Sequence, residues 1–325
     1  MHIPDGLLSA PVSLACATLS ATAVGIACAH ARKGFGPRRA ATVGVTAAFV
    51  FAAQMLNFPV AGGTSGHLVG GVLAAVLVGP STAVIVMTAV LVLQCLVFGD
   101  GGLLALGANV LNMAVLQPLV GFTLYRSVAG GGRPRSVRGI AGVAFGSWVA
   151  TVVAAAACAG ELTLSGVAAP ALVLSAMSGV HAVIGLGEAL IAALVVATVM
   201  RLRPELLGPI ADPSVKSRPA LAVALFGLPV SMALALFVSP FACSWPDGLE
   251  RVVERLGIEP SRARLSLPAP LRGYSIPGLD GSLLGTSLAA LMGTLLVFAV
   301  CLAIGCALAP SAGLRRVTDV ETPRS

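Results

Sequence analysis

The residues most able to do chemistry stand at the start of the chain, Met1 and His2, and in a glycine-rich stretch that ends at His67. Met1 offers its α-amine, and His2 offers its backbone amide and its near imidazole nitrogen, so the three atoms can close two fused chelate rings on one metal ion. The imidazole of His67 would complete a planar set of four nitrogens. Such nitrogen fields favour Ni²⁺ and Cu²⁺, and the same set can accept Co²⁺. We therefore predict a metal site formed by Met1, His2 and His67.

The composition is that of a membrane protein. Hydrophobic residues make up 57% of the 325 residues and charged residues only 10%, whereas a soluble domain carries about 25% charge. The mean hydropathy is +0.97. We expect an all-α polytopic helical bundle in contact with membrane lipid and without a nucleic-acid partner. Neither lysine, Lys33 or Lys216, belongs to a phosphate-binding Gly-x4-Gly-Lys-Ser/Thr loop, so we expect no ATPase site in this chain.

The apolar runs predict about nine membrane crossings. They are 12–31, 40–58, 68–78, 81–98, 103–125, 139–159, 171–200, 219–238 and 283–309. With nine crossings, most lysines and arginines fall in loops on one side: Arg32, Lys33, Arg38, Arg39, Arg126, Arg133, Arg135, Arg138, Arg201, Arg203, Lys216, Arg218, Arg315, Arg316 and Arg324. Because basic loops stay in the cytoplasm, we predict an external N-terminus and a cytoplasmic C-terminus.

The third run, 68–78, is too short to span a bilayer as a helix, at about 1.5 Å per residue. It follows the non-helical, glycine-rich stretch 59–66. Irregular backbone at membrane depth is tolerated where it lines a cavity, and such interruptions often mark a transport site. We therefore predict a re-entrant type of loop that places His67 on the external side, with the N-terminus.

The chain divides into two expected components. Residues 1–218 would form the metal-binding transmembrane component, and residues 219–325 a two-helix auxiliary component with an external segment, 239–281. Within this segment apolar residues recur at helical spacing, which predicts an amphipathic surface helix. Asp247 is its expected N-cap and Gly257 its expected end.

Other polar residues in apolar surroundings are candidates for supporting roles. A ligating imidazole usually needs an acceptor for its second nitrogen, and Ser65 or Asn109 could serve His2 or His67 in this way. Asn112 is a further candidate near the ion pathway, although both asparagines are equally explained by hydrogen bonds between helices. His181 and Glu188 lie on one helix face. Intramembrane ionisable residues suggest a functional site, but we expect these two to hold helices together.

Three segments resemble the substrate-binding membrane component of energy-coupling-factor nickel and cobalt transporters. They are Met-His-Ile-Pro-Asp-Gly at 1–6, Gly-Thr-Ser-Gly-His-Leu at 63–68 and Gly-Ala-Asn-Val-Leu-Asn-Met at 107–113. The stretch Pro-Asp-Gly-Leu-Glu at 246–250 is similar to the small auxiliary component of the same systems. The chain thus resembles a fusion of the two.

This resemblance implies that the Met1 amine, the amide and imidazole of His2 and the imidazole of His67 hold a transported Ni²⁺ or Co²⁺, with no permanent cofactor. It also implies high-affinity uptake across the cytoplasmic membrane, driven by separate ATPase subunits through a coupling membrane protein. Pro4-Asp5 and Gly66-His67-Leu68 look closer to the nickel type than to the cobalt type, which tends to carry Met-Glu and Ser-His-Pro there.

Three alternatives compete with this interpretation. Ser65 in a Gly-x-Ser-Gly stretch, with His181 as base, would suit an intramembrane serine protease. An organic cargo would call for a pocket with aromatic residues, but the chain has only two tryptophans and two tyrosines. A passive channel would differ from a coupled transporter in needing no ATP.

Overall fold

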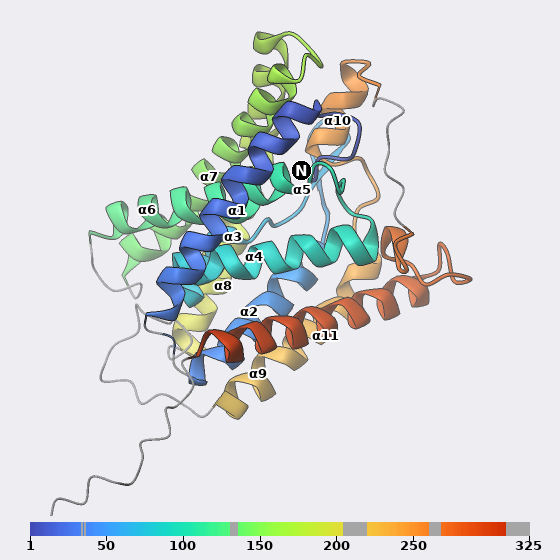
Figure 1. Ribbon diagram of the computed structural model, residues 1–325. Helices are drawn as coiled ribbons and strands as arrows, with labels where there is room; N and C mark the ends of the chain where they lie inside the picture. Colours follow the sequence, from blue (N-terminus) through green and yellow to red (C-terminus); the bar gives the residue numbers. More distant parts are fainter. Residues whose placement is uncertain (34, 36, 131–135, 204–219, 260–267, 310–325) are drawn as a thin grey trace, which may run out of the picture.

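The computed structural model describes residues 1–33, 35, 37–130, 136–203, 220–259 and 268–309. In these residues the fold is an α-helical bundle with one short hairpin, as the hydropathy pattern predicts (Figure 1). The helical elements are α1 Ala10–Arg32, α2 Pro37–Gln54, α3 Gly71–Val78, α4 Pro80–Leu93, η1 Gln94–Phe98, α5 Leu106–Asn109, η2 Val110–Leu116, α6 Gln117–Ala129, α7 Val137–Leu164, α8 Pro170–Leu202, α9 Ala220–Ala233, η5 Leu234–Val238, η6 Ser239–Phe241, α10 Gly248–Arg255, η7 Arg272–Tyr274 and α11 Leu283–Leu308. The strands are β1 Phe58–Val60 and β2 Thr64–Gly66, paired antiparallel.

Seven helical segments among the described residues are long and apolar enough to cross a membrane. They are Ala10–Arg32, Pro80–Phe98, Leu106–Ala129, Val137–Leu164, Pro170–Leu202, Val223–Phe241 and Leu283–Leu308. The apolar part of α2, Arg39–Gln54, is shorter. Helix α3 has 8 residues, which at about 1.5 Å each cannot span a bilayer alone. The nine crossings and the re-entrant loop therefore stay predictions.

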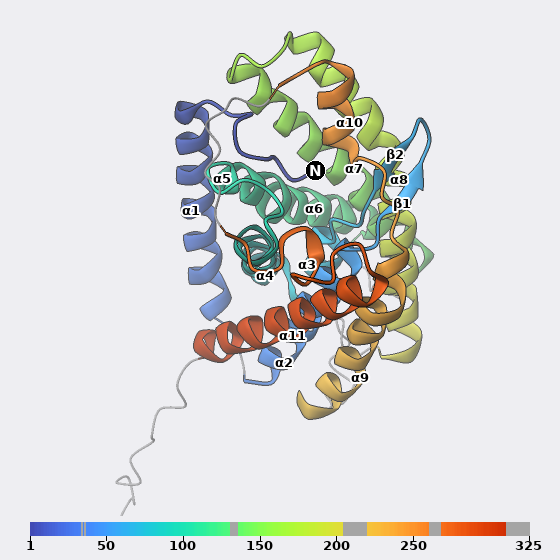
Figure 2. The same cartoon turned by 90° about the vertical axis from the view of Figure 1, so that its right-hand side faces the viewer.

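Loops distant in sequence meet at one end of the bundle, which we call the N-terminal end. Backbone and side-chain hydrogen bonds join them in pairs: Ser9 N to Ser165 Oγ at 3.0 Å, Gly102 N to Ile3 O at 2.8 Å, Cys243 N to Asn57 O at 2.8 Å and Ser65 N to Pro246 O at 2.9 Å. The N-terminus itself lies inside this end, beside α5 and α10 (Figures 1 and 2). The two predicted ligand segments, residues 1–2 and 67, therefore belong to the same end.

The C-terminal elements pack on the first part of the chain. Helices α9 and α11 lie against α2 (Figure 2). Gly305 of α11 allows this approach, because a Cβ there would lie 2.8 Å from Ala40 Cα. Helix α10 begins after Asp247, whose side chain forms a capping box with Glu250, and it stops before Gly257, where φ is +61°. The predicted surface helix and both of its end signals are confirmed.

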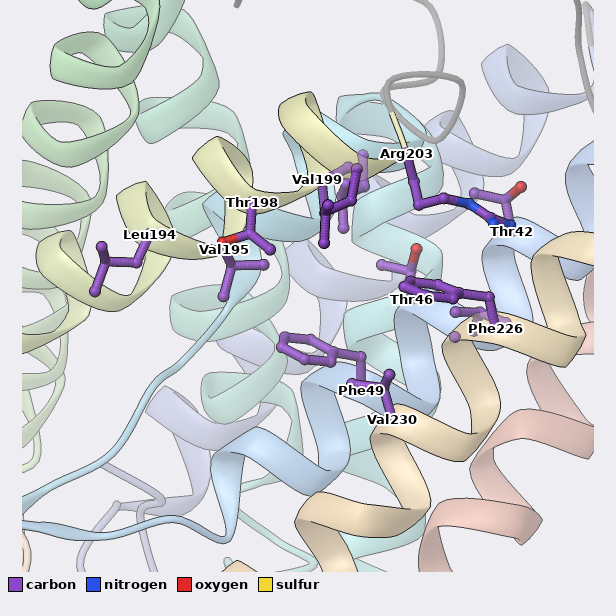
Figure 3. Close-up of a pocket in the computed structure, with 14 residues that line it drawn as sticks. Thr42, Thr46, Phe49, Leu194, Val195, Thr198, Val199, Arg203, Phe226 and Val230 are labelled. Atoms are coloured by element: carbon purple, nitrogen blue, oxygen red, sulfur yellow. The ribbon is translucent and has the colours of Figure 1, made fainter.

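A groove of about 390 Å³ separates α8 from α2 and α9 (Figure 3). Phe49, Val195 and Val230 line it, and the Arg203 guanidinium lies 4.5 Å from the centre of the Phe226 ring. The groove runs toward the far end of the bundle, where α8 ends. It is therefore separate from the segments that carry the predicted ligands.

Some of the residues on which the predicted topology depends lie outside the described residues. The expected component boundary at 218/219 lies there, as do Arg133, Arg135, Lys216, Arg218, Arg315, Arg316 and Arg324. Among the described basic residues, Arg32, Lys33 and Arg39 are exposed beside the turn between α1 and α2. Arg126 and Arg201 are exposed in the last turns of α6 and α8. These residues lie at the ends of α1, α6 and α8 and at the start of α2, and the side of the membrane that they face stays a prediction.

Candidate metal centre

The first residues of the chain are threaded into the bundle. Met1 is 4% exposed and Ile3 is fully buried. Asn109 of α5 holds the backbone of Ile3 on both sides, since Ile3 N donates to Asn109 Oδ1 at 2.8 Å and Asn109 Nδ2 donates to Ile3 O at 3.1 Å. This pairing satisfies a buried peptide group that would otherwise be costly to desolvate. Asn109 therefore positions the N-terminal segment rather than an imidazole.

Asp5 fixes the other end of the same segment. Its carboxylate accepts the backbone N–H groups of Leu103, Leu104 and Ala105 at 3.2, 2.8 and 3.3 Å. These groups precede α5 and have no partners within the helix, and a negative charge suits this helix end. The segment from Met1 to Asp5 is thus anchored at two points, which fixes the position of its first two residues.

The three predicted ligand residues lie together. The Met1 amine is 3.4 Å from Nε2 of His67. The rings of His2 and His67 are stacked, with 5.7 Å between their centroids and 21° between their planes. Nδ1 of His67 lies 3.1 Å from the carbonyl oxygen of Leu68, where it can donate, and this leaves Nε2 as an acceptor that faces the amine. The arrangement gathers amine and imidazole nitrogens in one buried place.

The partners of the His2 ring were not predicted from the sequence. Nδ1 of His2 lies 3.3 Å from Asp100 Oδ1, and Nε2 lies 3.3 Å from Gln94 Oε1. Asp100 also accepts a hydrogen bond of 2.5 Å from the hydroxyl of Tyr274. The one available signal was the position of Asp100 in a run of glycines, because such a loop lets the backbone approach closely. Gln94 lies in an apolar helix and carried no signal of its own.

The start of α10 and the segment before it cover the site. Asp247 forms an ion pair with the Met1 ammonium through Oδ2. Its other oxygen, Oδ1, caps α10 by accepting from the N–H groups of Leu249 and Glu250 at 2.8 and 2.9 Å. Ser65 Oγ donates to the carbonyl oxygen of Trp245 at 2.7 Å. Ser65 therefore ties the hairpin to the segment before α10 and does not contact an imidazole nitrogen.

The charges of this site shift one another's pKa values. Burial favours the neutral amine of Met1 and is the largest single effect, but the negative charges of Asp247, Asp100 and Glu250 together raise the pKa of the amine above its usual 8.0. Burial also opposes ionisation of Asp247, yet the Met1 ammonium holds the pKa of this carboxyl well below its usual range. Burial, with the nearby ammonium, lowers the pKa of His67 to about 4. At neutral pH the amine thus carries a proton and His67 is neutral.

Asn112 makes the hydrogen bond between helices that was its alternative explanation, since it donates to Glu161 Oε2 at 2.8 Å. One predicted grouping is not formed. The Ser65 and His181 pair of the protease alternative does not meet by hydrogen bond. Ser65 Oγ points to Trp245 O, and Nδ1 of His181 lies 2.9 Å from Met177 O in its own helix. The structure therefore lacks the geometry that nucleophilic catalysis by Ser65 requires.

The fold and this site define a class: a multi-pass membrane protein that buries its own N-terminal amine beside two imidazoles. Comparison with protein families agrees with this class. Residues 2–206 match the model of the cobalt uptake substrate-specific transmembrane region, and residues 221–310 match the PDGLE domain. The chain belongs to this family of cobalt uptake transmembrane regions, fused to a PDGLE domain.

Two of the relatives match this chain over nearly its whole length. A putative fused nickel transport protein of Archaeoglobus fulgidus is 37% identical over 302 residues, which cover 92% of this chain and 96% of the relative. A fused nickel transport protein of Rhodobacter capsulatus is 34% identical over 98% of this chain and 99% of its own length. The crystal structure of a truncated transition metal transporter is 33% identical, with a TM-score of 0.56 over 62% of this chain and 99% of that chain.

Proposed function

We propose that this chain captures Ni²⁺, and also accepts Co²⁺, as the substrate-binding subunit of an ATP-driven uptake transporter. The observation that carries the proposal is the buried contact of 3.4 Å between the Met1 amine and His67 Nε2, beside the His2 ring. The two full-length relatives named above are called nickel transport proteins. The cobalt transport protein of Desulforamulus reducens, 36% identical, matches only 39% of this chain. This difference in coverage favours nickel.

In this proposal the ligands are the amine of Met1, the amide and imidazole of His2 and the imidazole of His67. Each must present a lone pair, so the metal replaces protons on the amine and on the amide. For Nδ1 of His2 to bind, the ring exchanges its contact with Asp100 for the metal. Asp247 stays beside the amine, where it accepts a remaining N–H and keeps the lone pair directed at the metal, as carboxylates do for other metal ligands.

Orientation and energy supply are part of the same proposal. The N-terminal end, with the metal centre, faces the outside, and the C-terminus is cytoplasmic. Helices α2 and α3 complete nine crossings, with residues 68–70 extending the short α3 into the membrane. A coupling membrane protein and separate cytoplasmic ATPase subunits supply the energy. Membership of the family supports these partners, and the absence of a phosphate-binding loop from the sequence agrees with them.

Uptake of radioactive nickel by cells that express the chain tests the function. We expect accumulation against a gradient when the coupling protein and the ATPase are present, and its loss when a Walker-type lysine of the ATPase is replaced. His67→Ala should abolish uptake while the protein still reaches the membrane. Accumulation that is equal with and without an active ATPase would instead support a passive channel.

A further inference from the structure

Glu188 is a buried carboxylate that the metal site does not use directly. It lies in α8, is 1% exposed and has four neighbours in hydrogen-bond range. Gln117 Nε2 and the backbone N–H of Gly70 donate to Oε1 at 2.8 and 3.1 Å. The backbone N–H of Val69 donates to Oε2 at 3.2 Å, and Thr151 Oγ lies 2.9 Å from the same oxygen. A carboxylate surrounded in this way has no lone pair left for a cation.

Two of these donors follow His67 directly in the chain. Val69 and Gly70 form the turn that leads from His67 into α3, and Gly70 is the N-cap of this helix with φ of +82°. The turn depends on glycine at position 70, because φ is positive and a Cβ there would lie 3.0 Å from Val50 Cγ1. Glu188 thus holds the N–H groups of a turn whose shape sets the direction of the His67 backbone.

The same turn is connected to His2 through two glutamines. Gln54 Nε2 donates to the carbonyl oxygen of Val69 at 2.7 Å. Gln94 Nε2 donates to Gln54 Oε1 at 2.8 Å, and Gln94 Oε1 lies 3.3 Å from Nε2 of His2. The peptide groups of Val69 are therefore held from both sides, by Glu188 at the N–H and by Gln54 at the carbonyl. One continuous network joins both imidazole-bearing segments to a carboxylate in the interior of the bundle.

We infer that Glu188 is a positioning residue for the metal centre: it fixes the turn after His67 so that the imidazole meets the Met1 amine and His2 in one geometry. The inference rests on the proposed metal site. The physical reason is that a rigid ligand arrangement depends on hydrogen bonds beyond the ligands themselves. Four hydrogen-bond contacts to one buried side chain can supply that rigidity where water is absent.

A purely structural role makes a different prediction. Glu188 also joins α8 to α7 through Thr151 and to α6 through Gln117. If it only held these helices together, its loss would lower the unfolding temperature and leave the ligand field of a bound metal unchanged. If it positions His67, the ligand field changes in protein that remains folded.

The experiment compares Glu188→Gln with Glu161→Gln, using Ni²⁺ alone as the probe. Glu161 is a second buried carboxylate, in α7, and its hydrogen bonds come from Asn112 and Cys16 rather than from residues 68–71. The amide of Glu188→Gln keeps the volume of the side chain, but its NH₂ group cannot accept hydrogen bonds from the N–H groups that now donate to Glu188. We expect Ni²⁺ binding to weaken by about 10- to 100-fold, the usual effect of removing such a supporting group, with a shifted visible absorption band. Glu161→Gln should keep the wild-type affinity and band.

Each outcome decides between the explanations. Wild-type affinity and band in Glu188→Gln would overturn the inference, as would equal weakening in both variants. Failure of the wild-type protein to bind Ni²⁺ would instead refute the proposed function beneath it. Should Glu188→Gln not fold, Gln54→Met removes the hold on the Val69 carbonyl from the opposite side and keeps a side chain of similar length. We expect the same band shift in that variant, and an unchanged band there would also overturn the inference.

Discussion

Metal binding at Met1, His2 and His67 should release a defined number of protons. The Met1 ammonium has a pKa above 8.0, because Asp247, with smaller effects of Asp100 and Glu250, more than offsets the opposing effect of burial. His67, with a pKa lowered by burial to about 4, is already neutral at pH 7. Binding through the amine and the His2 amide should therefore release one proton from each, whereas His67 should release none.

The magnitude follows from linkage between metal and proton binding. Each displaced proton changes the apparent metal affinity tenfold per pH unit, so two protons give about 100-fold per unit. The metal binds only the deprotonated amine, so its affinity falls as the pH falls, because protons compete with the metal for the amine. His67 should add nothing to this slope until the pH approaches about 4.

Asp247→Asn supplies the control. Without the carboxylate, only the weaker effects of Asp100 and Glu250 oppose burial, so the pKa of the amine should fall. Near pH 8 the slope should then fall toward about tenfold per unit, since the amine carries a proton in fewer molecules and the amide proton is still displaced. Calorimetric titration with Ni²⁺ in two buffers of different ionisation enthalpy measures the protons released. An affinity that is independent of pH between about pH 6 and pH 8 would refute the proposed ligand set.

Three further predictions concern the N-terminal segment. Asn109→Ala leaves the buried N–H of Ile3 without its partner, whereas the carbonyl oxygen keeps the N–H of Gly102. We therefore expect a loss of about 1–3 kcal/mol in unfolding free energy, and an unchanged thermal unfolding midpoint would contradict this. The Met1–Asp247 pair should stabilise the metal-free protein only in a pH window. The contribution of Asp247 to the free energy of unfolding is present above its unfolded pKa of about 3.8 and is lost as the pH falls. The contribution of the Met1 ammonium is present below pH 8.0 and is lost as the pH rises through its raised pKa. An identical dependence of stability on pH in Asp247→Asn would refute the ion pair. Three residues added before Met1 convert the amine to an amide and should abolish Ni²⁺ binding, and retained stoichiometric binding would exclude the amine as a ligand.

Helices and candidate ligand residues could be predicted from the sequence more reliably than the contacts between distant side chains. Hydropathy identified the long apolar helices, and the chelating potential of Met1 and His2 with His67 led to residues that the structure places together. The end signals of α10 were also readable, because the capping by Asp247 is local. Local patterns of this kind depend only on neighbours in the chain.

The residues that hold the metal-site residues in place could not be predicted from the sequence, because their roles arise from contacts between distant segments. Asp247 looked like a helix cap, and its second oxygen meets Met1 only because α10 folds over the N-terminus. Gln94 looked like one polar residue in an apolar helix, yet it contacts both His2 and Gln54. Ser65 was predicted as an imidazole partner, but the backbone of Trp245 takes its hydroxyl instead. No spacing in the sequence encodes these pairings.

The central claim is that Met1, His2 and His67 hold the transported ion. Elemental analysis of the purified protein, with Met1 as its free N-terminus, tests this claim most directly after exposure to an equal mixture of Ni²⁺ and Co²⁺. His2→Ala serves as the comparison, since it removes the imidazole that lies 5.7 Å from the ring of His67. We predict one ion per wild-type chain, mostly nickel, and none in His2→Ala. No bound metal in the wild-type protein, or the same metal content in both, would contradict it.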